Sequence, residues 1–475
     1  MFRHQQNVRL YFVHKTNHFD SITRKKSWQT IFLSYKKKSL PSKVGSLCAC
    51  YFGLRGHEVH IYDFRNDPRT EKLSKGRSIN LALSTRGIEA LSRVGVEGVI
   101  LEHGIPMKGR MIHSKSGEKK SIPYDPVFLQ CIYSVGRKHL NELLITEAEK
   151  YQNVHLHFNH KITSVNFEEK KIFFKSADNN NSELKEDKGD LIVGADGAFS
   201  IVRREMMKQP MFNFSQTYIE HGYRELTIPP ANNFKMESNH LHIWPRGEFM
   251  LIALPNQDDS WTVTLFMPLV KFDELQGKEH AIKSFFQQNF PDALQLIGDS
   301  KVIEDFSKPS HLVSIKCTKY NVGNKAVILG DSAHAMVPFY GQGMNAGFED
   351  CRILDEFIHS EGLDLEEALE LFSITRAKNA EAICNLSMYN YSEMRQLVTQ
   401  TSYILRKKLD NILYWLFSSK WIPLYQSITF TNIPYSECLQ NRKRQNVILR
   451  NVFYVLLCAS VTPISWYIFR WKQSL

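Results

Sequence analysis

Two segments of the chain place an aspartate directly after a short, mostly apolar run. Asp196 and Gly197 follow residues 191–195, and Asp331 follows 326–330. A strand that ends in a turn before a helix presents such a carboxylate at the edge of a sheet, where it can accept hydrogen bonds from sugar-like hydroxyl groups. The glycine-rich run 341–347, beyond Asp331, offers backbone N–H groups to an anion or a carbonyl oxygen. Together the two segments indicate a site for a nucleotide-like cofactor.

A third acid, Asp63, ends a predicted strand near the start of the chain. Residues 44–54 predict a helix, and residues 58–63 alternate as a strand does. This helix and strand match the second half of a dinucleotide-binding βαβ unit, in which the acid binds ribose hydroxyls. On its own the pattern is weak, because any amphipathic helix followed by a strand satisfies it.

The loop before that helix departs from the G-x-G-x-x-G pattern. Only the third glycine, Gly45, is present, because Leu40 and Ser42 replace the two that let the backbone approach a pyrophosphate. The lysines at 36–38 interrupt the apolar residues 31–33 before they reach the turn. We therefore expect the first strand of the sheet to be absent or badly formed, and pyrophosphate binding to be impaired.

The rest of the body predicts a mixed α/β protein. A second sheet is expected within 210–315, and the pattern from about 365 to 440 is helical. The segment 401–430 mixes apolar runs with basic residues, so it can lie on a membrane surface or pack on the body, and we favour packing.

The net charge of +11 does not indicate nucleic-acid binding. Residues 1–45 carry ten Lys and Arg against one acid, whereas the remaining residues sum to only +2. No basic-aromatic module accompanies that charge. The eight cysteines are scattered, and no metal site is expected among them.

The two ends of the chain have their own signals. The uncharged stretch 451–469 matches the thickness of a bilayer core and is bracketed by charges, which predicts a membrane span within 446–470, a buried core helix being the alternative. Residues 1–42 are basic and acid-poor, as in a mitochondrial transit peptide or an unrelated leader.

From about residue 44 to the C-terminal stretch, the chain resembles the kynurenine 3-monooxygenase family of the FAD-dependent aromatic hydroxylases. The paired turns at Asp196 and Asp331 are similar to the two signatures of those hydroxylases. The more specific similarity is carried by residues 77–84 (RSINLALS), 104–107 (GIPM), 241–245 (LHIWP), 338–350 (PFYGQGMNAGFED), 386–391 (LSMYNY) and 422–425 (IPLY).

The resemblance implies which residues bind FAD. These cofactor-binding residues are Val44, Gly45, Asp63, Arg65, Ala82, Arg137, Asp196, Asp331, Met344 and Asn345. It implies NADPH as the reductant and O₂ as the oxygen source, with a C4a-hydroperoxyflavin hydroxylating L-kynurenine to 3-hydroxykynurenine. No protein nucleophile and no metal are implied, and we expect His334 to be structural.

The resemblance also implies a substrate site. Arg110 is expected to bind the substrate carboxylate, with Tyr124, Asn390 and Tyr425 adding hydrogen bonds. Gln342 and Pro338 are expected to line the site. The candidates for an apolar wall around the aromatic ring are Leu241, Ile243, Phe266, Pro338 and Phe339.

The predicted architecture is an FAD-binding, three-layer Rossmann-like α/β domain with an inserted, mostly antiparallel substrate sheet, a helical C-terminal region and a membrane span. The predicted segments are a leader (1–42), three parts of the FAD domain (43–110, 131–205 and 316–364), two parts of the substrate domain (111–130 and 206–315), a helical region (365–445) and the span (446–470). The family resemblance places the chain at the mitochondrial outer membrane with its body facing the cytosol.

Two alternatives stay open at this point. The first is a membrane-anchored scaffold of the same fold that has lost FAD with its glycine loop and is catalytically silent. The second is another flavin enzyme, a related hydroxylase or a halogenase, although no lysine-bearing tunnel motif of a halogenase is present.

Overall fold

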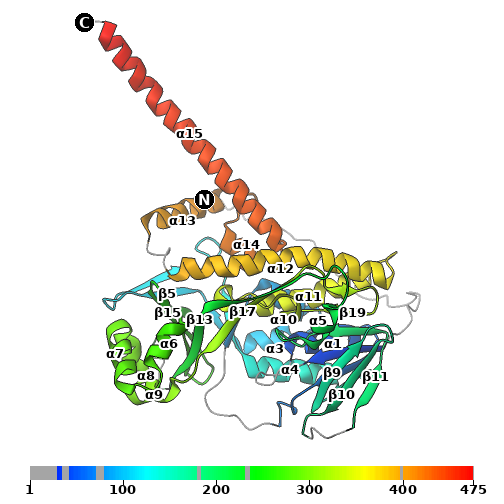
Figure 1. The fold of residues 1–475 in the computed structure, drawn as a ribbon. Coiled ribbons are helices and arrows are strands. Elements are labelled where there is room, and N and C mark those ends of the chain that lie inside the picture. Colours follow the sequence, from blue (N-terminus) through cyan, green and yellow to red (C-terminus); the bar gives the residue numbers. More distant parts are fainter. Residues whose placement is uncertain are drawn as a thin grey trace, which may run out of the picture.

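The computed structural model describes residues 29–34, 42–70, 80–178, 183–230, 236–395 and 400–473. A six-stranded sheet forms the centre of the first domain (Figure 1). Every strand pair in it except β18–β19 is parallel. In order across the sheet, its strands are β18 (Asn321–Val322), β19 (Ala326–Ile328), β12 (Leu191–Gly194), β1 (Gln29–Ser34), β2 (Glu58–Asp63) and β8 (Val154–His157).

The first strand is present, so the prediction that it would be absent or badly formed is wrong. β1 lies between β12 and β2, with Ile31 in register with Ile192 on one side and His60 on the other. Ile31 and Phe32 are fully buried, so the short apolar run suffices for a central strand. The strand ends at Ser34, before the lysines that were expected to disrupt it. The sheet thus includes part of the segment 1–42 that was assigned to a leader, while Leu40 lies outside the described residues.

Helices cover this sheet and share one large apolar core with it. α1 (Lys43–Leu54) packs between α4 (Arg137–Glu149) and α11 (Gly343–Ile358). Ser42 caps α1 by accepting a hydrogen bond from the backbone N–H of Gly45. Two smaller helices follow β12 and β19, namely α5 (Ile201–Met206) and α10 (Asp331–His334). The turns that carry Asp196 and Asp331 therefore lie at the carboxyl ends of parallel strands.

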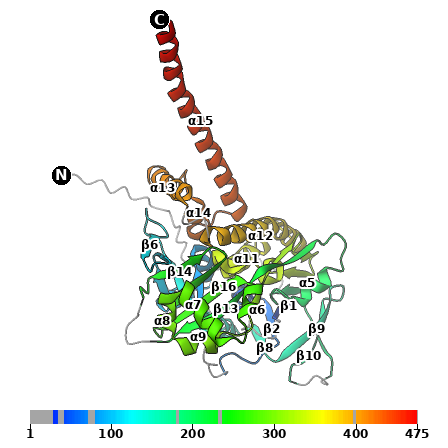
Figure 2. The same cartoon turned by 60° about the vertical axis from the view of Figure 1, so that its left-hand side comes forward.

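A seven-stranded sheet forms the second domain (Figure 2). In order, its strands are β17 (Ser310–Cys317), β13 (Phe214–Ile228), β16 (Trp261–Pro268), β15 (Phe249–Pro255), β14 (His240–Arg246), β5 (Gly109–His113) and β6 (Lys119–Pro123). One face packs on the helices α6 (Leu269–Leu275), α7 (Glu279–Asn289), α8 (Pro291–Ile297) and α9 (Asp299–Asp305). Side chains alternate across the sheet, so Trp244 points to these helices while Ile243 and Met250 belong to an apolar cluster on the other face.

Two three-stranded sheets complete the body. The first, β3 (Asn80–Leu83), β7 (Ile132–Gly136) and β4 (Ile105–Met107), lies beside α2 (Thr85–Ser92) and α3 (Glu97–Glu102) in the chain. The second consists of β11 (Lys185–Lys188), β10 (Lys171–Ser176) and β9 (His160–Asn166).

The C-terminal region is helical. Its helices are α12 (Leu365–Arg395), α13 (Thr401–Leu416), α14 (Leu424–Phe430) and α15 (Tyr435–Gln473). α14 is buried, which agrees with the expected packing of 401–430 on the body, whereas α13 buries only Asp410 and Tyr414. Asp410 fastens α13 by accepting hydrogen bonds from the indole of Trp421 and from Arg442 on α15.

The structure contradicts the prediction of a membrane span within 446–470. α15 projects from the body (Figure 1), but no helix in the part of the chain that the structure describes is long and apolar enough to cross a membrane. The outer-membrane location stays a prediction.

Candidate functional site

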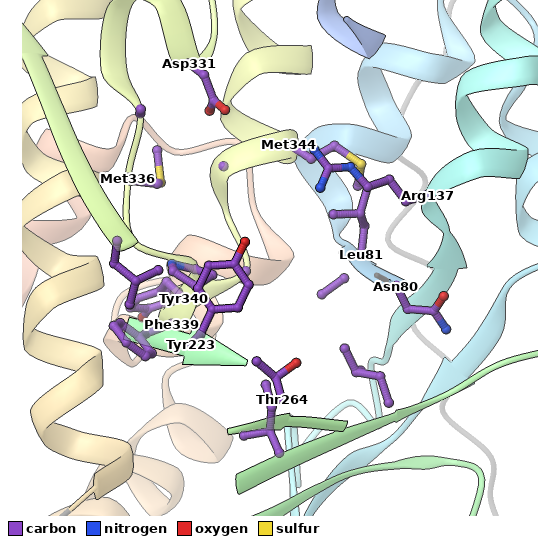
Figure 3. Close-up of a pocket in the computed structure, with 18 of the residues that line it drawn as sticks. Asn80, Leu81, Arg137, Tyr223, Thr264, Asp331, Met336, Phe339, Tyr340 and Met344 are labelled. Atoms are coloured by element: carbon purple, nitrogen blue, oxygen red, sulfur yellow. The ribbon is translucent and has the colours of Figure 1, made fainter. Parts of the chain in front are cut away.

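A cavity of about 430 Å³ is lined by residues from both large sheets. The turns after β12 and β19 and the start of α1 form one end, and strands of the seven-stranded sheet form the other (Figure 3). The predicted residues that line it are Val44, Arg65, Ala82, Arg110, Tyr124, Arg137, Asp196, Asp331, Pro338, Met344 and Tyr425. Gly45, Asp63, Gln342, Asn345 and Asn390 lie behind this surface.

The Asp331 turn is held in shape from behind. Gly330 has a φ of +56°, which a residue with a side chain rarely adopts, and its N–H donates to Asp350 at 2.8 Å. His334 also contacts Asp350, at 2.6 Å, and both side chains are buried away from the cavity. His334 is therefore structural, as expected. Asp331 itself is exposed and faces the cavity (Figure 3).

A buried ion network anchors the helix that follows this turn. Glu349 on α11 contacts Arg86 at 2.5 Å and Arg376 at 2.7 Å, and Arg376 also contacts Asp350 at 2.7 Å. Burial alone would raise the pKa of Glu349, but Arg376 and Arg86 outweigh it, so this pKa lies below its ordinary value. The network joins α2, α11 and α12 behind the end of the cavity that Asp331 lines.

The start of α1 packs closely against the turn that holds Asp331 and against α11, which follows that turn. A Cβ atom built on Gly347 would lie 2.7 Å from a methyl carbon of Val44, so no larger residue fits there without movement. Gly45 lies in the first turn of α1, where its N–H bonds to Ser42. Neither Gly45 nor Gly347 lines the cavity, and each glycine contributes by allowing close packing.

Asp196 and Asp63 hold other parts of the protein. Asp196 accepts hydrogen bonds from the N–H groups of Ile201 and Val202 and from Ser332, so it caps α5. Burial raises the pKa of Asp196. Asp63 accepts hydrogen bonds from the backbone N–H and the guanidinium of Arg65. Asp63 therefore positions Arg65, which lines the cavity.

Asn345 joins α11 to the edge of β3. Its side-chain oxygen accepts a hydrogen bond from the Ser84 N–H, and its NH₂ group donates to the carbonyls of Ala82 and Gly341. Its neighbour Met344 lines the cavity. Asn345 thus fixes the spacing between two cavity walls, which sequence inspection could not distinguish from direct contact with a ligand.

Arg110 lies at the other end of the cavity and is almost fully buried. Its guanidinium packs over the ring of Tyr425 at 4.8 Å and that of Tyr124 at 5.6 Å, and it lies 3.8 Å from Glu393. Its Nε has no hydrogen-bond partner among the described residues. Burial opposes the charged form, but Tyr425, Tyr124 and Glu393 together raise the pKa of Arg110 above its ordinary value. Arg110 is thus a buried cation with a donor free for an anion.

Sequence inspection missed three polar residues around Arg110. Glu393 contacts it, Tyr403 hydrogen-bonds Glu393, and burial followed by the charge of Arg110 lowers the pKa of Lys407 to about 8. The spacing held a signal, because Glu393 is three residues after Asn390 on one face of α12, and Tyr403 and Lys407 are four apart on α13. These residues add a carboxylate and an amine to the expected arginine.

Asn390 and Gln342 differ in placement from their predicted roles. Asn390 donates to the carbonyl of Phe339 at 2.6 Å, so it positions a wall residue. Gln342 points away from the cavity, donating to Ser84 and accepting from the hydroxyl of Tyr435. Both are buried side chains that support the lining from behind.

The wall between the two ends is apolar and aromatic. Phe339 stacks on Tyr391 at 3.9 Å and contacts Phe266 at 4.9 Å between ring centroids. Leu241, Phe266, Pro338 and Phe339 line the cavity as predicted, and Ile243 is buried beneath them. This wall suits a flat, apolar ring.

The cofactor end fits FAD by its donor set. Arg137, at the start of α4, points its side chain into the cavity, and its Nε has no hydrogen-bond partner in the described residues (Figure 3). A guanidinium at a helix start suits a phosphate. The exposed carboxylate of Asp331 suits a hydroxyl-bearing chain. A half-buried cation and a polyol acceptor at one end of the cavity are what this dinucleotide requires.

Comparisons with known proteins agree with this fit. The family described as FAD binding domain matches residues 43–382. The oxygenase of 2-methyl-3-hydroxypyridine-5-carboxylic acid has a similar fold, with a TM-score of 0.62 at 16% identity, covering 82% of this chain and 97% of that one. The p-nitrophenol 4-monooxygenase of Pseudomonas putida gives 0.61 at 14% identity, covering 82% and 93%. The family match and the fold define an FAD-binding α/β protein.

Relatives of higher sequence identity show which family of FAD-binding proteins the chain belongs to. The kynurenine 3-monooxygenase of Anopheles gambiae is 54% identical over 90% of this chain and 88% of its own length. That of Sus scrofa is 44% identical over 86% and 87%, respectively. The chain belongs to the kynurenine 3-monooxygenase family.

Proposed function

We propose that the chain hydroxylates L-kynurenine to 3-hydroxykynurenine with FAD as its bound cofactor, NADPH as the reductant and O₂ as the oxygen source. The observation that carries the proposal is Arg110, a buried cation with a free donor at the end of an aromatic-walled cavity whose other end fits FAD. Kynurenine combines a carboxylate with an aromatic ring, so it matches both features.

Arg110 and Glu393 recognise the two charges of an amino acid. The guanidinium of Arg110 donates to the carboxylate, and the nearby carboxylate of Glu393, 3.8 Å from Arg110, accepts from the α-ammonium group. The rings of Tyr124 and Tyr425 hold the guanidinium in place. Both substrate charges are then compensated in a buried site, which an uncharged aromatic compound would not achieve.

The aromatic ring of the substrate lies against the apolar wall. Phe339 and Phe266 form its surface, while Asn390 fixes Phe339 through its carbonyl. This wall excludes water from the reacting ring carbon, and the anchored carboxylate directs the ring toward the Asp331 end.

The cofactor end supplies the chemistry. FAD, when bound and reduced, delivers an electrophilic oxygen atom from O₂, so the protein needs no nucleophile of its own. Arg137 would hold the pyrophosphate and Asp331 a ribityl hydroxyl. The choice of NADPH as the reductant is supported by the family, not by a separate nucleotide motif.

The test is product formation by the full chain supplied with FAD, NADPH and kynurenine under ¹⁸O₂. We expect 3-hydroxykynurenine carrying one ¹⁸O atom, detected by mass spectrometry, and negligible turnover of an aromatic acid without an amino-acid group. Flavin absorbance of the same sample reports cofactor content. A flavin-loaded protein that forms no product would refute the proposal, whereas a protein that takes up no flavin and forms no product would favour the silent scaffold.

A further inference from the structure

A group of histidines lies outside the cavity, on strands β2 and β8 at the edge of the six-stranded sheet. β2 and β8 pair in parallel, with His60 opposite His155. Alternation along β2 places Glu58 on the same face as His60, because they are two residues apart. Val59 and Ile61 point the other way, into the core. The register therefore gathers two imidazoles and a carboxylate.

The potential ligand atoms of these three residues lie within 4.8 Å of one another. Oε1 of Glu58 lies 2.6 Å from Nε2 of His155 and 3.7 Å from Nε2 of His60. A tetrahedral ion with bonds of about 2.0–2.1 Å places neighbouring ligand atoms about 3.3 Å apart. The two observed distances bracket that value, so small side-chain rotations suffice to complete the arrangement.

His157 supports this group from the second layer. Its Nε2 is 3.0 Å from Nδ1 of His60, and its ring is sandwiched between those of His60 and Tyr62, at centroid distances of 5.2 and 4.5 Å. The hydroxyl of Tyr62 donates to Asp187 at 2.7 Å. Histidine ligands of metals commonly have their second ring nitrogen hydrogen-bonded in this way, which fixes the ring orientation. The contact leaves Nε2 of His60 directed at Glu58.

We propose that Glu58, His60 and His155 bind one divalent ion of the zinc class, with water as the fourth ligand. Two imidazoles and one carboxylate are ligands that suit zinc. None of the three residues lines the cavity, so the ion lies outside the site described above and links the edge strand β8 to β2. His60 and His155 are far apart in the sequence, so no motif of fixed spacing reveals the site.

The experiment titrates Zn²⁺ into the chelator-treated full chain against a chromophoric competitor, with melting temperature as a second readout. We expect about one high-affinity equivalent per chain and a higher melting temperature. His60→Gln and His155→Gln should each abolish that equivalent. His157→Gln should weaken binding by about 10- to 100-fold, as is typical when a second-layer partner is lost.

The matched control is His139→Gln. His139 and His103 have ring centroids 4.8 Å apart, and in the part of the chain that the structure describes no third ligand joins them. This variant should bind Zn²⁺ as the parent does. If His60→Gln folds poorly by circular dichroism, Glu58→Gln, whose side chain is 43% exposed in the parent, replaces it. The absence of a high-affinity equivalent, or equal binding by the ligand variants and the control, would overturn the proposal.

Discussion

Replacing Arg110 by alanine removes the cation that the account assigns to the substrate carboxylate. Arg110 is 7% exposed, and its free Nε and the flanking rings make it a preorganised anion receptor. Loss of one buried, charge-assisted pair costs roughly 2–4 kcal/mol. The dissociation constant of kynurenine should therefore rise about 30- to 1,000-fold. Arg110→Lys should recover only part of this affinity, because the planar fork is lost.

The assay is a titration of the FAD-loaded protein with kynurenine, followed by the change in flavin absorbance. Lys108→Gln is the matched control, because Lys108 is exposed on the same segment and removing its charge should leave affinity nearly unchanged. A second ligand, the amine that lacks the carboxylate of kynurenine, should bind the parent and the alanine variant about equally. Unchanged kynurenine affinity in Arg110→Ala, with normal flavin content, would refute the assignment.

Three further predictions concern the support of the fold and the cofactor. Glu349→Gln should destabilise the protein by about 3–5 kcal/mol in chemical denaturation, since two buried arginines lose their shared carboxylate; a loss below about 1 kcal/mol would contradict this. Burial lowers the pKa of His242 from 6.5 to about 4. Between these two pH values the unfolded chain therefore binds a proton that the folded chain does not bind. The free energy of unfolding should fall by roughly 3 kcal/mol as the pH drops from 6.5 to 4. His242→Gln should flatten that slope, and an unchanged slope would show that His242 is not its source. The missing loop glycines should leave FAD occupancy below one per chain, and the double variant Leu40→Gly, Ser42→Gly should raise it by flavin absorbance; a fully loaded parent would show that the glycines are dispensable.

The sequence allowed good prediction of the groups that follow strands. Asp331 lines the cavity because the carboxyl ends of parallel strands meet at one edge of a sheet, and the pattern of an apolar run followed by an acid identifies such ends. Asp196 follows the same rule and also lines the cavity, yet its carboxylate is used to cap α5. Sequence therefore located the turns but did not distinguish a carboxylate that faces the cavity from one that caps a helix.

Other features depended on packing that a local pattern does not contain. β1 forms despite the lysines after it, because burial between two strands outweighs its shortness. Gln342 turns toward Tyr435, a partner far along the chain. Glu393 reaches Arg110 only because α12 crosses the end of the cavity. The pairing of His60 with His155 likewise depends on the register of β2 and β8.

The most direct test of the account is an experimental structure of the chain with FAD and kynurenine bound. We expect the kynurenine carboxylate within hydrogen-bonding distance of the Arg110 guanidinium, the kynurenine ring against Phe339, and FAD extending past Asp331 to Arg137. Kynurenine bound with its carboxylate away from Arg110, or FAD outside this cavity, would contradict it.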